Sequence, residues 1–187
     1  MSDIFPRTFF PTACMSYPRS GHHALVEVLR AYFKENFHYC ELYRNPPPEL
    51  LLGAPGSPTN YVKNHDFNLE TPILSDRNYL VQVRNPLAAI ESWDELDRRV
   101  GHRTPDSQEK KLDFWTAFVK KWVFGPVPSR LVVWYEDLLR DPPATTTSVI
   151  QFLTKTQNVD NPLLEECLRK FPLSLRTQTR PTRYTKA

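Results

Sequence analysis

The sequence predicts an α/β fold in which helices cover both faces of a parallel sheet, giving three layers. Short apolar runs of strand length alternate with segments whose apolar residues recur at helical spacing. Polar residues follow the strand-like runs, and ligand sites of open α/β sheets lie at such strand ends. The length of 187 residues fits a single domain over residues 1–187, large enough to bury a substantial core.

The first predicted strand and helix enclose a distinctive loop. Residues 13–17 predict a short buried strand, and apolar residues at helical spacing predict a helix that reaches Phe33. Between them lies Pro18-Arg-Ser-Gly-His-His23, where a helix begins and its first N–H groups lack intrahelical partners. Gly21 lets the backbone approach a ligand closely, and Arg19 adds a forked positive charge. These features are typical of a phosphate-binding loop.

The middle of the chain contains two further predicted strands. Residues 45–60 include three consecutive prolines and predict a surface loop. A short strand is predicted over residues 61–63 and another over residues 79–83, followed by a helix that begins at Pro86. Ser107 is a candidate cap for the next helix. The tryptophans of that helix suit either the core or an apolar acceptor pocket.

The last third completes the alternation of strands and helices. Residues 131–135 are continuous, β-branched and aromatic, which predicts a strand buried on both faces. A helix is predicted over residues 144–153, and Asn161 with Pro162 is predicted to cap another. Residues 176–187 read as an extended basic tail of the domain.

Composition and charge exclude several classes of protein. A net charge of +3 with an isoelectric point of about 8.8 favours an anionic ligand but is too mild for nucleic-acid binding. The three cysteines are widely spaced, which predicts neither a disulfide framework nor a thiol metal site. We expect a cytoplasmic protein, because no signal peptide and no run of roughly 18 apolar residues is present.

Four segments, in the same chain order, resemble sulfotransferases that use 3′-phosphoadenosine 5′-phosphosulfate (PAPS). The loop at residues 17–23 resembles the family's Tyr-Pro-Lys-Ser-Gly-Thr-Thr loop. The segment from Arg84 to Ser92 resembles the family's Arg-Asn-Pro…Ser segment, whose Arg and Ser, also eight residues apart, bind the 3′-phosphate. A helix would bring both side chains towards one anion, Arg84 as a bidentate donor.

Two other segments extend the resemblance. Residues 62–65 resemble the family's Lys-Thr-His, whose histidine is the general base; neutral imidazole is available for this role at neutral pH. Residues 133–142 resemble the family's Tyr-Glu-Asp-Leu…Asp-Pro, which would put Tyr135 near the adenine. Alternatively, Tyr135 finishes a core strand, His65 is a solvated loop residue, or Arg84 pairs with a surface carboxylate.

The resemblance implies a P-loop NTPase-like sulfotransferase fold and a sulfuryl transfer from PAPS, leaving adenosine 3′,5′-bisphosphate (PAP), without a metal. The acceptor would be a small molecule or glycan bearing a hydroxyl or amine, in direct in-line transfer. The implied catalytic residues are His65, Lys63 and Arg19. The implied cofactor-binding residues are Arg19, Ser20, Gly21, His22, His23, Arg84, Ser92 and Tyr135. Two alternatives remain, a sulfotransferase-like binding domain without catalysis and a nucleotide-phosphate kinase related by fold.

Two departures from the family pattern bear on these expectations. His22 and His23 replace the Thr-Thr pair of the family loop. An imidazole N–H can replace a hydroxyl as a donor, although backbone N–H groups do most of the cradling. The family's C-terminal Arg-Lys-Gly segment, which clamps the 3′-phosphate, has no clear match; Arg176, Arg180 or Arg183 are candidates to supply its charge.

Overall fold

The computed structural model describes residues 10–42, 59–102 and 105–173. Five parallel strands form one sheet in the order β2-β3-β1-β4-β5. The strands are β1 Thr12–Ser16, β2 Tyr39–Leu42, β3 Tyr61–Asn64, β4 Asn78–Val83 and β5 Ser129–Trp134. The helices are α1 His22–Phe33, α2 Pro86–Val100, α3 Gln108–Trp122, α4 Tyr135–Arg140, α5 Pro142–Thr154 and α6 Asn161–Lys170, with a short 3₁₀ turn at Lys34–Asn36. The predicted α/β fold with a parallel sheet is confirmed.

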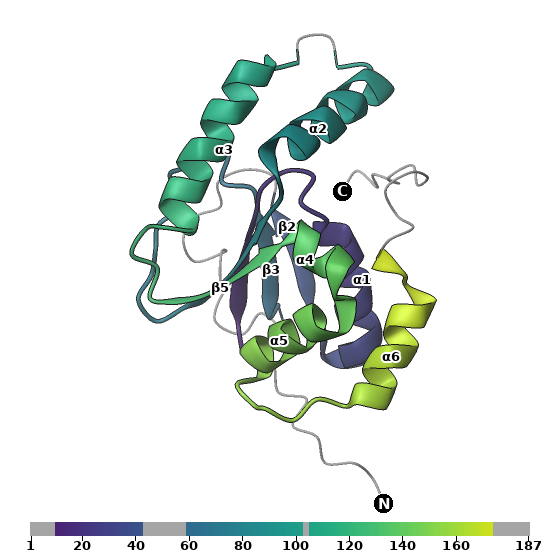
Figure 1. The fold of residues 1–187 in the computed structure, drawn as a ribbon. Coiled ribbons are helices and arrows are strands. Elements are labelled where there is room, and N and C mark those ends of the chain that lie inside the picture. Colours follow the sequence, from purple (N-terminus) through teal and green to yellow (C-terminus); the bar gives the residue numbers. More distant parts are fainter. Residues whose placement is uncertain (1–9, 43–58, 103–104, 174–187) are drawn as a thin grey trace, which may run out of the picture.

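The sheet separates two apolar layers. Alternate side chains of each strand point to opposite faces, so Ala13 and Met15 join one core cluster while Cys14 joins the other. One cluster packs the sheet against α3, including the fully buried Trp122. The opposite cluster packs it against α1, α5 and α6, which lie together on one side in Figure 1. Helices α2 and α3 form an antiparallel pair on the other side (Figure 1).

Local sequence signals account for the helix ends. The Asn85 side chain accepts hydrogen bonds from the N–H groups of Leu87 and Ala88, and Pro86 begins α2 as predicted. Ser107 caps α3 by accepting from the N–H of Lys110, which is also as predicted. The cap of α6 was predicted wrongly, because Asp160, one residue before Asn161, accepts from the N–H of Leu163.

Two strands differ from the sequence-based expectations. The run at residues 131–135 is not a strand buried on both faces: β5 lies at an edge of the sheet, and Val133 is its one buried residue. An apolar run indicates a strand but does not reveal whether that strand has one neighbour or two. Tyr135 does not finish this strand but begins α4. Strand β2, which was not predicted, forms the opposite edge.

Some predicted segments fall outside the described residues. The basic tail at residues 176–187, with its candidate arginines, is one of them. Most of the predicted loop at residues 45–60 is another. Within the described ranges, none of the helices combines the length and apolar character needed to cross a bilayer.

Candidate functional site at the carboxyl edge of the sheet

The parallel sheet brings the predicted site residues to a single edge. Each strand ends at this edge, and the strand order sets their sequence along it: His65 follows β3, the 18–23 loop follows β1, Arg84 follows β4 and Tyr135 follows β5. Residues from four distant parts of the chain therefore lie around the start of α1. This edge is where ligands bind in open α/β sheets.

The 18–23 loop has a backbone shape that depends on Gly21. Gly21 has a φ of 81°, in the left-handed region, and Arg19 also has a positive φ of 66°. A Cβ added to Gly21 would lie 2.3 Å from Cδ2 of Tyr135. The aromatic ring of Tyr135 thus packs directly beneath the loop backbone and leaves no room for a side chain.

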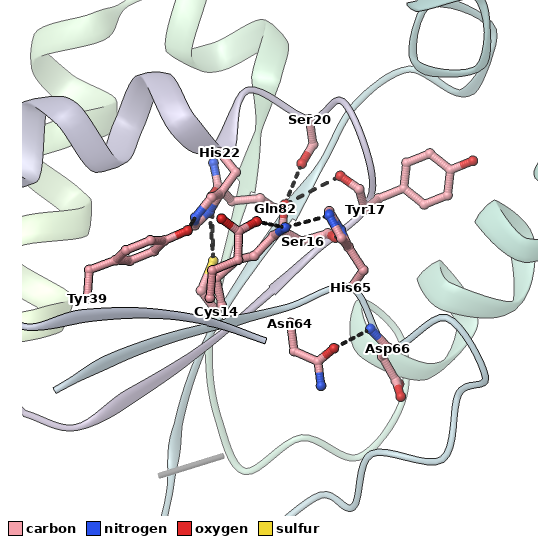
Figure 2. Close-up of polar contacts among 12 residues, drawn as sticks. Cys14, Ser16, Tyr17, Ser20, His22, Tyr39, Asn64, His65, Asp66 and Gln82 are labelled. Carbon is pink, nitrogen blue, oxygen red and sulfur yellow. Dashed lines mark hydrogen bonds and ion pairs between the residues drawn. The ribbon is translucent and has the colours of Figure 1, made fainter. Parts of the chain in front are cut away.

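The start of α1 offers hydrogen-bond donors. No described side chain caps this helix, and in the described part of the chain no acceptor contacts the N–H groups of Gly21, His22 or His23. Unpartnered N–H groups at a helix N-terminus attract anions. The hydroxyl of Ser20 instead turns inward, where its Oγ lies 3.0 Å from Oγ of Ser16 (Figure 2).

Arg84 and its neighbours form a cationic cluster, here called the anion half of the site: Arg19, Arg84, Ser92 and Tyr135. The Arg84 guanidinium lies 4.4 Å from the centre of the Tyr135 ring and donates to the Arg19 carbonyl at 3.3 Å. Its Nε is buried without a hydrogen-bond partner, and no described carboxylate forms an ion pair with it. Nε of Arg19 donates to Oγ of Ser92 at 3.0 Å.

Helix α3 fixes the backbone of this half. The indole N–H of Trp115 donates to the Arg84 carbonyl at 2.9 Å, and the Tyr17 hydroxyl donates to the Lys111 carbonyl at 2.9 Å. Trp122 lies in the core rather than in a pocket, because it is fully buried. The Glu136 side chain accepts from the N–H of Asn85 at 2.9 Å and so ties the start of α2 to α4.

On the other side of the loop, three residues form what is here called the base half: Glu41, Lys63 and His65. The Ser16 carbonyl can only accept, so His65 carries its proton on Nδ1 and donates it to this carbonyl at 2.5 Å. Nε2 of His65 then holds a lone pair, and it faces Nζ of Lys63 at 2.5 Å. Lys63 also pairs with the Glu41 carboxylate at 2.5 Å.

Burial and charge keep His65 neutral in this arrangement. Burial, together with the neighbouring Lys63 ammonium, lowers the pKa of His65 to about 3. Burial also lowers the pKa of Lys63, whereas the Glu41 carboxylate opposes that shift by favouring the charged ammonium. A proton acceptor and a cation therefore stand side by side at the loop.

The segment after His65 is held by α3. The Asp66 carboxylate is fully buried and accepts from Nζ of Lys121 at 2.7 Å and from the Trp122 indole at 2.9 Å. Lys121 also donates to the carbonyls of Leu69 and Thr71 at 2.8 and 2.6 Å. These contacts fix the turn that aims the His65 ring at Ser16 (Figure 2).

The two loop histidines occupy different environments. The His22 ring is buried below the loop, where Nδ1 contacts the Gln82 side-chain oxygen at 2.8 Å and Nε2 contacts the Tyr39 hydroxyl at 3.1 Å (Figure 2). Burial lowers the pKa of His22 well below its usual range. The His22 ring is therefore buried and already paired, whereas the His23 side chain is exposed. No group of three or more potential metal ligands occurs among the described residues.

Sequence reasoning missed Glu41 and Gln82. Glu41 lies in β2, the strand that was not predicted, and pairs in register with Lys63 on β3. Gln82 is a fully buried polar residue inside the apolar β4 run, and it supports His22 and the Cys14 thiol. The polar residue within a buried strand was the available signal for Gln82. The indication of Glu41 was weaker, because the local sequence does not show which strands pair with one another.

Comparisons with known proteins give the fold a name. No known family model and no curated protein matches the sequence. Among solved structures, mouse sulfotransferase SULT7A1 complexed with PAP superposes with a TM-score of 0.65 at 17% identity, covering 88% of this chain and 64% of that one. Retinol dehydratase in complex with androsterone and inactive cofactor PAP superposes with a TM-score of 0.62 at 16% identity, covering 90% and 66%.

These similarities bear on the fold alone. The chain spans about two thirds of the length of both solved structures. Its five-stranded parallel sheet, with helices on both faces, matches their architecture. The chain therefore has the sulfotransferase fold.

Proposed function

We propose that this protein is a sulfotransferase that moves a sulfuryl group from PAPS to a hydroxyl or amine of an acceptor. The observation that carries the proposal is the anion half. In a domain with the sulfotransferase fold, the Arg84 guanidinium stands at the carboxyl edge of the sheet with a buried, unpartnered Nε. A buried donor without a partner is unfavourable, and a bound anion would satisfy it.

The donors present fit a nucleotide with two separate anionic groups. The N–H groups at the start of α1 suit the 5′ phosphosulfate, because they are uncapped and converge at one helix end. Arg84 and Ser92 suit a 3′-phosphate, since a forked guanidinium and a hydroxyl can bind one phosphate together. The solved neighbours SULT7A1 and retinol dehydratase were crystallised with PAP, which supports the same ligand class.

Arg19, Lys63 and His65 would each have a separate role in the transfer. When bound, PAPS supplies the sulfuryl group on a phosphate that leaves without needing protonation. Arg19 is an exposed guanidinium on the loop and would neutralise the charge that develops on the departing oxygen, with Lys63 in support. His65 would take the proton of the acceptor at Nε2 while Nδ1–H stays on the Ser16 carbonyl. Transfer would be direct, with no covalent intermediate on the protein.

Aromatic side chains beside His65 suggest where the acceptor would lie. The Phe67 ring, 49% exposed, lies 5.0 Å from the His65 ring, 5.9 Å from Trp93 and 5.7 Å from Phe114. This apolar surface borders the base half, so it supports an acceptor with an apolar or aromatic part next to its reacting hydroxyl or amine.

Calorimetric titration tests the cofactor. PAP should bind at least about 10-fold more tightly than AMP, because a charge-assisted contact to the 3′-phosphate contributes about 1.5–3 kcal/mol. Equal affinities for PAP, AMP and ATP would favour a nucleotide-phosphate kinase related by fold. After binding is measured, a screen of hydroxyl and amine acceptors with labelled PAPS tests the transfer itself.

A second function, binding without catalysis, has one observation in its favour. In this structure Lys63 occupies the lone-pair position of Nε2 of His65, which is the atom a general base needs. Tight PAP binding with no label transferred to any acceptor would support the binding function. Turnover that disappears in a His65→Ala variant would reject it.

A further inference from the structure

We propose that Glu41 is a positioning residue for the base: its carboxylate holds the Lys63 ammonium on Nε2 of His65, and an anion at the 18–23 loop draws Lys63 away. The first part of the proposal, that Glu41 holds Lys63 on His65, concerns the free protein and does not depend on the proposed function. The second part, the release of Lys63, rests on the proposed function, because it requires an anionic ligand at the loop. Together they make proton acceptance by His65 depend on occupancy of the loop.

The geometry of Glu41, Lys63 and His65 supports the first part of the proposal, that Glu41 holds Lys63 on His65. Glu41 and Lys63 are register neighbours on β2 and β3, and their charged atoms lie 2.5 Å apart. The Lys63 side chain is 2% exposed and that of Glu41 14%, so water does little to screen this pair. Nζ of Lys63 lies 2.5 Å from Nε2 of His65. One ammonium is thus shared by a carboxylate and an imidazole lone pair.

The tautomer of His65 is fixed, so the position of Lys63 determines whether His65 can accept a proton. Because Nδ1–H is committed to the Ser16 carbonyl, Nε2 is the single atom of His65 that can accept a proton. With Lys63 in place, a second ring proton would face an ammonium across a hydrogen-bond distance. The acceptor's proton could reach Nε2 only after Lys63 moves, while Nδ1–H stays on the carbonyl throughout.

Lys63 acts electrostatically on His22 and His23 at the end of the loop, so an anion bound there would act on Lys63. His65 bonds to the carbonyl of Ser16, and the Ser16 hydroxyl contacts Ser20 inside the loop (Figure 2). Lysine has a long flexible stem, so its ammonium can change partners without moving the strand. A dianionic group at the start of α1 would add negative charge on the side of Lys63 away from β2.

Several charged and titratable groups of the described residues act on Lys63 and His65 and so affect their pKa values. Lys63 is faced by Cys14 of β1 and Glu41 of β2, and it acts on His22 at the start of α1. His65 is faced by Lys63, by Glu41 and by His23. Burial raises the pKa of Cys14 to about 12, so this thiol stays neutral.

The experiment measures the pKa of His65 by NMR titration of the imidazole signals, assigned with a His65→Gln variant. In the free protein, Lys63→Met should raise this pKa by about one unit or more, because the variant removes the cation and keeps the shape. Glu41→Gln should also raise it, because Lys63 loses the carboxylate that holds it on Nε2. Lys110→Met and Glu95→Gln, which change exposed side chains outside the base half, should leave it unchanged.

The sign of the Glu41→Gln shift is decisive. The Glu41 carboxylate by itself favours a charged His65, so its removal with Lys63 still in place would lower the pKa of His65. A lower pKa in Glu41→Gln, or an unchanged pKa in Lys63→Met, would overturn the proposal. An unchanged pKa of His65 in Glu41→Gln would show a merely structural role of Glu41 and would also overturn the proposal.

The proposed release of Lys63 from His65 is tested by adding saturating PAP. The pKa of His65 should rise in the wild-type protein, and it should rise less in Lys63→Met, where no cation remains to be displaced. Equal shifts in the two proteins would reflect the charge of the ligand alone and would overturn the release of Lys63. Absence of PAP binding by calorimetry would reject the proposed function and this release together, while the free-protein titrations would still decide the role of Glu41.

Discussion

The anion half and the base half lie on opposite sides of one loop but differ in how their charges are satisfied. In the anion half, the Arg84 guanidinium rests on the Tyr135 ring and has a buried N–H without a partner. In the base half, Lys63 is neutralised by Glu41 and caps His65. The first therefore has a buried donor that an anion could satisfy, whereas in the second the lone pair of Nε2 of His65 is already occupied by Lys63.

This difference predicts that substitutions in the two halves have separable effects. The largest should come from His65→Ala, which should lower turnover with a verified acceptor by about 100-fold or more, the usual scale for a lost general base. PAP affinity should stay almost intact, which also shows that the variant is folded. His102→Ala removes an exposed histidine at the end of α2 and serves as the control. Full turnover in His65→Ala would remove the base half from the mechanism.

Arg84→Ala should have the opposite pattern. Loss of a charge-assisted phosphate contact should weaken PAP binding by about 10- to 100-fold, measured by calorimetry. Arg84→Lys should recover part of the affinity, because it keeps the charge but not the forked geometry. Arg99→Ala, which removes an exposed partner of Glu95, should leave affinity unchanged. An unchanged affinity in Arg84→Ala would mean that its buried N–H serves no phosphate.

The packing beneath the loop can be separated from its backbone conformation. Gly21→Ala and Gly101→Ala both place an alanine at positive φ, which costs about 1–2 kcal/mol. Only at Gly21 would the new Cβ also meet the Tyr135 ring, whereas nothing lies within 4 Å at Gly101. Gly21→Ala should therefore lose about 1–3 kcal/mol more unfolding free energy in denaturant titrations. Equal losses would show that Tyr135 does not support the loop.

The smallest effect should come from Ser92→Ala. It removes the hydroxyl that accepts from Arg19 and that, in the proposed function, would donate one neutral hydrogen bond to the 3′-phosphate. PAP affinity should fall by about 0.5–1.5 kcal/mol, or about 2- to 10-fold. Ser148→Ala, on the exposed face of α5, is the matched control. A loss as large as that of Arg84→Ala would mean that Ser92 acts mainly by placing Arg19.

Most of the fold could be predicted from the sequence, because its signals are local. Proline at Pro86 and the cap at Ser107 mark helix starts through their own backbone chemistry. Apolar runs gave β1, β3 and β4 to within a residue or two. The edge positions of β2 and β5 could not be predicted, since strand order depends on contacts between segments that are far apart in the chain.

The sequence by itself determined which residues follow the strands of the site: the 18–23 loop, His65 and Arg84. Only the tertiary structure decided which of them meet. It paired Arg19 with Ser92, set Tyr135 against Gly21 and turned the His22 ring into the core. It also brought Glu41 to Lys63 across two strands. The physical reason is that spacing along the chain fixes local backbone geometry, whereas the state of a charged side chain depends on neighbours supplied by sheet order.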